Sequence, residues 1–447
     1  MKKRILYICL VTVLGLNLLI GAQIYVSNVQ AAESENVYEE IRLLMRVMER
    51  VRQDYVDGEK VTYSDLIQAA MKGMLNTLDP HSEFMDSRKY IDLKNDTEGA
   101  FGGVGIVVGM RENFLTVVSP MEDTPAYNAG ILAGDRIVRI EGRVTEKISL
   151  PEAVRKLRGE PGTAVTISVM RRSSNEEGGE VKDFKLTRAI IKVDTVKDIN
   201  GKREFPLGDE KVGYVRLTQF GEHTTEELRK ALKKLDDAGM EGLIIDLRNN
   251  PGGLLDQAVK VCDIFLPDDQ LIVSTEGRSG PLKGEEYKAT GKDEYPNVRI
   301  VVLVNKWSAS ASEIVSGCLQ DLKRAYVIGE QTFGKGSVQS IMPLNDGTAL
   351  RLTTAKYYTP SHKVIHERGI TPDSIVPLSD EEAEALFIKR VLGGFESLDE
   401  AQKAKVNQIR DVQLDRAMDY LKSQLIYGDR ASRLQRGDAQ ITAQREE

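Results

Sequence analysis

The chain has 447 residues, of which 41% are hydrophobic and 29% are charged, a composition typical of a globular protein with room for about three folded domains. Its 68 acidic and 61 basic side chains give a formal net charge of −7, which argues against a nucleic-acid-binding protein because such proteins usually present a basic face to phosphates. Three cysteines and four histidines, without an HExxH motif or a Walker-type loop, argue against a disulfide framework and against most metal-dependent and nucleotide-driven enzymes, so we expect no metal site and no cofactor.

The first residues of the chain have the three parts of an export signal. Basic residues at positions 2–4 precede an apolar stretch over residues 5–20, and small side chains at positions 29–31 suit a signal peptidase. We expect residues 1–31 to be a signal peptide or a membrane anchor, because apolar character continues weakly to Val26 and nearly reaches the length that spans a bilayer. Either form predicts export to the periplasm or to the outer face of the cytoplasmic membrane of a bacterium, and an anchor would add membrane association.

Residues 33–98 show the spacing of amphipathic helices. Apolar side chains recur at helical intervals from Ile41 to Tyr55 and again from Leu66 to Leu75. Such a stripe usually forms core, but in helices outside the main domains it could also pair subunits. A homodimer formed through the helical termini is therefore one expectation.

Residues 99–190 change to short β-like runs that alternate with turn residues and with two short helical stretches. A glycine-rich turn enters the first of these strands, with glycines at positions 102, 103 and 105. Glycine lets the backbone approach a ligand closely and turns several N–H groups to one side, which makes a nest for a carboxylate. The edge of the strand that follows can accept an extended peptide.

The order of motifs after this turn is similar to that of a PDZ domain. Thr124–Ala126, Ala129–Gly130 and Leu132–Asp135 follow one another, and the resemblance covers about 90 residues. It implies that a peptide C-terminus binds at Gly102, Gly103, Val104, Gly105 and Ile106. A PDZ fold with a purely structural role is the alternative, because a fold alone does not give a function.

Residues from about 210 to 376 alternate strand-like and helix-like patterns. Several runs are largely apolar, which is typical of sheet strands covered on both faces. The predicted strands are 213–217, 243–247, 300–304 and 326–328. The predicted helices are 254–266, 310–322 and one that Thr225 caps and that runs through Ala238. Cys262 and Cys318 lie in the helical patterns, so we expect two buried thiols, although one disulfide between them is an alternative. The tail from Ser379 is helical and charged.

Three turns, each directly after a predicted strand, carry the candidate catalytic residues. They span Asp246–Gly253, Asn305–Glu313 and Phe333–Gln339. Small residues around Ser310 permit a sharp turn into a helix and leave a hydroxyl at the positive end of that helix, where a developing oxyanion is favoured. Turns that follow parallel strands meet at the carboxyl end of one sheet, so we expect these three to converge.

A serine hydroxyl needs a base, and a lysine can be that base only if burial disfavours its charge. Lys335 lies between two glycines, with Phe333 and Val338 nearby, which fits a poorly hydrated site. A Ser–His–Asp triad is the rival arrangement. The four histidines lie in no motif for it; they are His81, His223, His362 and His366.

The combination of these turns with the PDZ-like region resembles the C-terminal processing peptidases, the tail-specific serine proteases of the S41 type, from about residue 35 to 425. The resemblance implies Ser310 as the nucleophile, Lys335 as the general base and Gln339 as the residue that orients the lysine. It implies backbone oxyanion donors at Ala311 and at Gly252 or Gly253.

The same resemblance implies the architecture and the activity. We expect an α/β multidomain protein with a crotonase-like core over 191–376, an inserted PDZ domain over 99–190, and flanking helical regions over 33–98 and 377–447. The implied protein is an exported serine endopeptidase that recognises free C-termini of proteins or peptides and cleaves through an acyl-enzyme.

Two positions and two rival functions stay open. Trp307 departs from the pattern, which usually has a small residue there, so it could line the substrate channel or only pack. Arg158 is a candidate contact between the PDZ-like region and the catalytic domain, or a plain surface arginine. The rival functions are a non-catalytic peptide-binding scaffold, against which the Ser310, Lys335 and Gln339 set argues, and a crotonase-like acyl-transfer enzyme.

Overall fold

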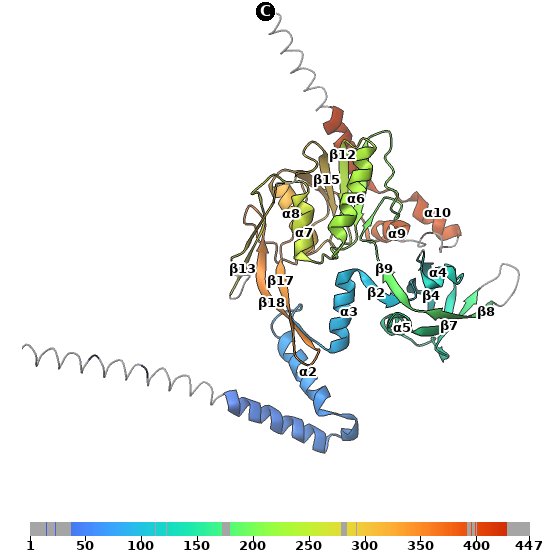
Figure 1. Cartoon of the computed structure of the whole chain (residues 1–447), viewed down its shortest axis with the longest axis vertical. Helices are drawn as coiled ribbons and strands as arrows, with labels where there is room; N and C mark the ends of the chain where they lie inside the picture. Colours follow the sequence, from blue (N-terminus) through green and yellow to red (C-terminus); the bar gives the residue numbers. More distant parts are fainter. Residues whose placement is uncertain are drawn as a thin grey trace, which may run out of the picture. The chain divides into compact units, whose positions relative to one another are not determined.

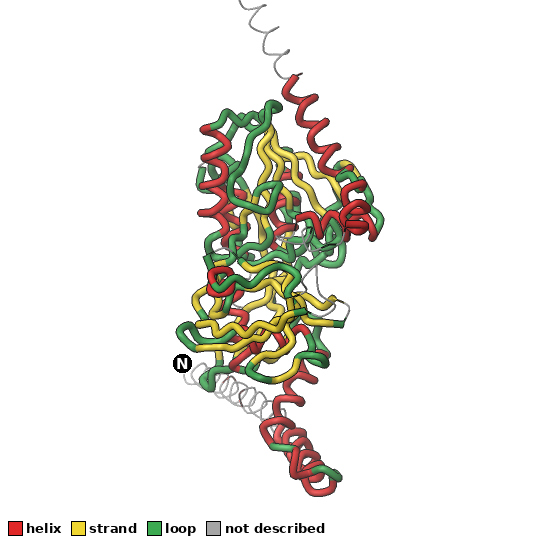
Figure 2. The backbone as a smooth tube through the Cα atoms, turned by 90° about the vertical axis from the view of Figure 1, so that its right-hand side faces the viewer, coloured by secondary structure: helices red, strands yellow, loops and turns green. Residues whose placement is uncertain are grey.

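The structure is a computed structural model, shown in Figures 1 and 2, and it describes residues 37–426 together with residues 15 and 23. Within 37–426 the exceptions are residues 112, 122, 172–178, 279–283, 292, 391–394, 396, 397 and 399. Apart from two positions, the predicted signal peptide or anchor lies outside the described residues. Among the helices that are described, none combines the length and the apolar character needed to cross a membrane.

Two compact units make up the chain, Met1–Phe84 and Met85–Glu447. In the first unit, a helix over residues 37–54 precedes a 3-10 turn (η1, Gly58–Lys60) and helix α2 (Tyr63–Asn76). The two helices coincide with the helical spacing of the sequence. Most apolar side chains of the first helix are exposed.

Within the second unit, the chain enters and leaves the PDZ-like region through one pair of strands. β1 (Glu83–Met85) spans the boundary of the units, and α3 (Ser87–Glu98) follows it. β2 (Ala100–Gly103) then pairs antiparallel with β9 (Ala189–Lys192). The two ends of the intervening region therefore lie side by side.

Between these ends lies a six-stranded antiparallel sheet in which β3 is an edge strand and helix α5 contacts β3. Its strands are β3 (Ile106–Arg111), β4 (Phe114–Pro120), β5 (Arg136–Ile140), β6 (Arg143–Val144), β7 (Ala164–Arg171) and β8 (Glu180–Thr187), and its helices are α4 (Pro125–Asn128) and α5 (Leu150–Leu157). Side chains that alternate along the strands fill a separate core, for example Val117, Ile140 and Val165. An edge strand beside a helix leaves room for an added peptide strand.

The central sheet of the second unit is parallel except at one edge. Its strand order is β10 (Val196–Lys197), β11 (Val212–Leu217), β12 (Gly242–Asp246), β15 (Arg299–Val304), β16 (Ala325–Gly329) and β19 (Ser374–Ile375), and only β10 is antiparallel. Helices α6 (Thr224–Asp237), α7 (Leu255–Asp263) and α8 (Ala311–Asp321) cover one face, and a helix over 412–426 covers the other. Since successive side chains point to opposite faces, Ile245 and Val302 pack under α6–α8 while Ile244 and Val301 pack under helix 412–426.

A second group of antiparallel strands lies beside this sheet. β17 (Ser337–Pro343) pairs with β18 (Ala349–Tyr358), β18 with β13 (Leu271–Gly277), and β13 with β14 (Glu286–Lys288). The sequence patterns did not predict these four strands. Two further helices, α9 (Asp380–Arg390) and α10 (Glu400–Gln408), follow in the tail.

The predicted core elements agree with the structure to within a few residues, with one shift. α6 begins at Thr224, so Thr225 lies inside the helix and does not precede it; its hydroxyl donates to Gln257 Oε1 at 2.7 Å. The two thiols are free and buried, as expected for Cys262 and Cys318, and burial raises the pKa of the Cys318 thiol.

Candidate active site

The three predicted turns meet at the carboxyl ends of β12, β15 and β16, which are neighbours in the sheet. Ala309 N–H donates to the carbonyl of Asn250 at 3.0 Å, which joins the first turn to the second. Phe333 N–H donates to the carbonyl of Ser308 at 3.0 Å, which joins the third turn to the second. The expectation that these turns converge is therefore confirmed.

Ser310 has a strained backbone at the point where the chain leaves β15 and enters α8. Its φ is 54° and its ψ is −113°, a region that side-chain-bearing residues seldom adopt. Strain of this kind is found mainly where function requires it. A Cβ on Gly252 would lie 2.8 Å from Ser310 Cβ and 3.0 Å from Ala311 N, so only glycine permits this approach of the first turn to Ser310.

The backbone N–H groups near Ser310 differ in what they already bind. Ala311 is the first residue of α8, and the first N–H groups of a helix have no acceptor within it. Gly252 N–H donates to Asn250 Oδ1 at 2.9 Å, so this donor is occupied in the present conformation. Of the two glycines considered from the sequence, Gly253 is the one whose N–H is not bound by Asn250.

A buried carboxylate that the sequence analysis missed connects Ser310 to the loop of Lys335. Glu313 Oε1 accepts from the Thr332 hydroxyl at 2.6 Å and from Gly334 N–H at 2.7 Å. Glu313 Oε2 accepts from Ser310 N–H and from Lys335 N–H, both at 2.8 Å. Burial raises the pKa of this carboxyl, although the four donors favour its charged form. The signal in the sequence was the serine-to-glutamate spacing of a capping box, of which the Glu313 half is formed.

Lys335 is half-buried two residues before β17, and its pKa lies below that of an ordinary lysine. Burial is the main cause, repulsion from Arg351 adds to it, and attraction by Glu313 opposes it. Among the hydrogen bonds of the described residues, none joins Lys335 Nζ to Ser310 Oγ. The structure therefore places the two residues on connected loops without a direct bond.

Gln339 lies in β17 and does not bind Lys335 in this conformation. Its Nε2 donates to the carbonyl of Ser337 at 3.0 Å and to the Ser337 hydroxyl at 2.8 Å. Nearby, Val338 is buried as expected, but Phe333 is 55% exposed, which corrects the expectation that it shields the site from water.

A cleft of about 450 Å³ opens beside the glycine turn. α3 contributes Tyr90 and Leu93 to its lining, the first turn contributes Gly252 and Gly253, and Gln339 lies on the strand side. Trp307 does not line this cleft: it is 55% exposed and borders a different surface hollow.

The predicted peptide-binding residues fall on two elements. Gly102 and Gly103 belong to β2, which pairs with β9, whereas Ile106 begins the edge strand β3. Gly105 has φ 76°, and a Cβ there would lie 2.2 Å from Thr124 Cβ, so glycine is required between the two.

Arg158 directly follows helix α5 of the PDZ-like region and contacts α3. Its guanidinium donates to Asp96 Oδ1 at 3.1 Å and lies over the Phe101 ring at 4.2 Å. Because Asp96 belongs to α3, and α3 lines the cleft, Arg158 lies one element away from the glycine turn.

The chain is similar to known proteins over both regions. It matches the model of peptidase family S41 over residues 211–376 and that of the PDZ domain over residues 116–171. It is 43% identical over 386 residues to a carboxy-terminal-processing protease of Bartonella bacilliformis, covering 84% of this chain and 83% of that relative. It is 37% identical over 383 residues to a carboxyl-terminal-processing protease of Synechocystis, covering 81% and 86%. Among solved structures, a photosystem II D1 C-terminal processing protease is 27% identical, with a TM-score of 0.44 over 79% of this chain and 97% of that one.

The carboxylate of Glu313 gives the first testable prediction. In Glu313→Gln, an amide NH₂ replaces one acceptor oxygen and faces N–H donors, which should lower the free energy of unfolding by about 1–3 kcal/mol. Displacement of Ser310 from the Lys335 loop should lower kcat for peptide hydrolysis by about 10- to 100-fold. Glu330→Gln is the control, because Glu330 lies on the loop after β16 and, among the residues that the structure describes, accepts a single long bond, from Leu378 N–H at 3.5 Å. A wild-type kcat in Glu313→Gln would contradict the view that Glu313 holds Ser310 and the Lys335 loop together for catalysis.

Proposed function

Because the chain belongs to peptidase family S41 and is a serine-type, C-terminal processing protease with a PDZ domain, we propose that it is an exported endopeptidase that uses Ser310 and Lys335 as a catalytic dyad. The observation that carries this proposal is the strained Ser310 at the start of α8, which Glu313 connects to the Lys335 loop. The parallel strands and helices α6–α8 that carry these loops support a crotonase-like core.

The proposed reaction has two steps. Ser310 Oγ attacks the carbonyl carbon of the scissile bond while Lys335 Nζ takes its proton. The backbone N–H groups of Ala311 and Gly253 stabilise the oxyanion, and Lys335 then gives the proton to the leaving amine. Water, activated by the same lysine, hydrolyses the acyl-enzyme ester and restores Ser310.

This reaction requires a change from the conformation described above. Lys335 Nζ must approach Ser310 Oγ, and the Gln339 amide must turn from Ser337 towards the lysine if it is to orient it. We therefore propose that the structure represents a resting state. Binding of a substrate in the adjoining cleft would favour the catalytic arrangement.

The PDZ domain is proposed to bind the C-terminus of the substrate. Val104, Gly105 and Ile106 lead into the free edge of β3, and α5 flanks that edge, which supports addition of a peptide strand. The bond from Arg158 to Asp96 gives a direct physical route from α5 to α3, which lines the cleft.

Export and self-association are further proposals. The basic residues at positions 2–4 and the apolar stretch over 5–20 support export, with membrane association if the segment is not removed. Exposed apolar side chains on helix 37–54, such as Ile41, Leu44 and Met45, support a homodimer formed through this helix. Fractionation of cells and light scattering of the purified chain would test the two proposals separately.

The main test of the function uses an unfolded protein substrate with a free apolar C-terminus. We expect the wild-type protein to cleave it, and to cleave the same substrate with a charged C-terminus more slowly. Ser310→Ala should abolish cleavage and leave tail binding intact, because a methyl group cannot attack the carbonyl. Ser308→Ala and Ser312→Ala are matched controls, since their hydroxyls donate to Leu247 O at 2.8 Å and to Asn250 O at 3.0 Å. Tail binding without any cleavage by the wild-type protein would instead favour a scaffold.

The role of Lys335 as a base predicts a direction of pH dependence. Since only the neutral amine accepts a proton, kcat/KM should rise with pH, with a midpoint below the pKa of an ordinary lysine. Lys335→Arg keeps the charge but cannot lose its proton, so it should lower kcat/KM by about 100-fold or more, as Lys335→Ala does. Lys306→Arg is the control, because Lys306 is exposed and paired with Asp380. Substantial activity in Lys335→Arg would refute the role of Lys335 as a base.

The contact between Arg158 and Asp96 predicts coupling between tail binding and cleavage. Arg158→Ala should leave tail binding unchanged but reduce the preference for an apolar over a charged tail by about fivefold or more. Short peptides that do not reach the PDZ domain should be cleaved at the wild-type rate. Arg155→Ala, at an exposed position of the same helix, should change neither quantity. Equal losses on proteins and short peptides would indicate a direct catalytic defect.

A further inference from the structure

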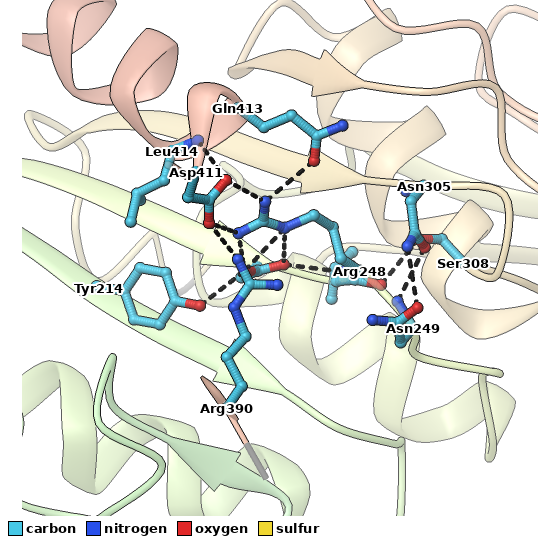
Figure 3. A network of polar contacts seen from close by, with 11 residues as sticks. Tyr214, Arg248, Asn249, Asn305, Ser308, Arg390, Asp411, Gln413 and Leu414 are labelled. Carbon is cyan, nitrogen blue, oxygen red and sulfur yellow. Dashed lines mark hydrogen bonds and ion pairs between the residues drawn. The ribbon is translucent and has the colours of Figure 1, made fainter. Parts of the chain in front are cut away.

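A buried network of two arginines and two aspartates lies at the start of the first catalytic turn (Figure 3). The side chain of Arg248 is 1% exposed and donates to both carboxylates of the network. Its Nε donates to Asp246 Oδ1 at 2.9 Å, and its Nη1 and Nη2 donate to the two oxygens of Asp411 at 2.8 and 3.0 Å. Arg390 also donates to Asp411, and the half-buried Arg216 donates to the carbonyl of Arg390 at 3.2 Å.

The network joins parts of the chain that are far apart in sequence. Asp246 ends β12 and Arg248 begins the turn, whereas Asp411 comes 163 residues later, directly before helix 412–426. Gln413 in the first turn of that helix strengthens the junction: its Oε1 accepts from Arg248 Nη1 at 3.0 Å, and its Nε2 donates to Val376 O at 2.7 Å. The C-terminal segment therefore binds the turn directly.

The turn that Arg248 begins departs from strand and helix geometry at three residues. Asn249, Gly252 and Gly253 have φ values of 60°, 99° and 148°. On the side of Ser310, the turn is fixed by a pair of hydrogen bonds between Asn249 and Asn305, at 2.9 and 3.0 Å (Figure 3). On the side of β11, Phe220 N–H donates to Gly252 O at 2.9 Å and Leu254 N–H donates to Phe220 O at 2.8 Å. The guanidinium of Arg248 is a further anchor at the start of the turn, and it binds both Asp246 and Asp411.

Loss of the Asp411 charge would leave this anchor in an unfavourable state. Arg248 and Arg390 would then share one carboxylate, Asp246, in a region from which water is largely excluded. A buried charge without its partner is strongly unfavourable, so the arginines and the turn would have to move. Movement of the turn would displace Gly253 N–H and the close contact between Gly252 and Ser310.

We propose that Asp411 is a positioning residue for the active site, which acts through Arg248 on the turn that supplies an oxyanion donor. The C-terminal segment would thereby complete the catalytic geometry from outside the three turns at the end of the sheet. Asp411 touches no reacting atom. The inference rests on the proposed function only in naming the turn as catalytic.

The test compares Asp411→Asn with Asp415→Asn in the full chain. Asp411 Oδ1 accepts from Leu414 N–H at 3.1 Å at the start of the helix, and asparagine caps a helix as well as aspartate, so Asp411→Asn removes the charge without removing the cap. Asp415 lies on the same helix and pairs only with the exposed Arg410 among the ion pairs described. Both variants are otherwise isosteric with the wild type.

Asp411→Asn should lower kcat by about tenfold or more with KM changed less than about twofold, because the turn acts on the transition state. The pH midpoint of kcat/KM should stay at its wild-type value, because Lys335 is not affected. Hydrogen exchange should increase by about tenfold or more in peptides that cover residues 247–254, and not in peptides from β11. Asp415→Asn should behave as the wild type in every measurement.

Identical kcat and exchange in the two variants would overturn the proposal. A general increase of exchange across the central sheet, with unchanged turnover per active enzyme measured by burst titration, would also overturn it, because it would indicate a purely structural role. If the wild type itself cleaves nothing, the proposed function fails, while the exchange at residues 247–254 still decides whether Asp411 holds the turn.

Discussion

The arrangement of the candidate site depends on one buried carboxylate. Glu313 is removed from water, which disfavours its charge, and only four donors at 2.6–2.8 Å make its burial tolerable. Two of these donors are the backbone N–H groups of Ser310 and Lys335, so the proposed nucleophile and base are held through the main chain, and neither of their side chains takes part in these bonds. This explains how the loops can be fixed in a structure in which Ser310 Oγ and Lys335 Nζ are not bonded to each other.

The strands of the central sheet could be predicted because the sequence pattern of each strand lies within a few consecutive residues. Strands such as β12 and β15 are buried on both faces and appear in the sequence as short apolar runs, each followed by a turn rich in small residues. Once parallel strands are inferred, the meeting of their carboxyl ends follows from geometry, and the positions of Ser310 and Lys335 follow with it.

Other features could not be predicted because they depend on contacts with remote residues. β18 is half-buried and carries polar side chains, so its pattern does not separate it from a loop. Arg248 forms hydrogen bonds with Asp411, which lies 163 residues later in the sequence, and no local sequence pattern indicates this pairing. The orientation of Gln339 towards Ser337 is likewise a matter of side-chain rotamer, which the backbone pattern does not specify.

The pairing of β2 with β9 has a consequence for how such proteins can diversify. Because Gly102 lies opposite Ile190, the PDZ region enters and leaves its host through neighbouring positions of a two-stranded ribbon. A segment with adjacent ends can be inserted into a loop without separating the flanking elements of the host. PDZ domains that prefer other substrate C-termini could therefore replace this one at the β2–β9 ribbon, in evolution or by recombination in the laboratory. The catalytic turns would keep their positions.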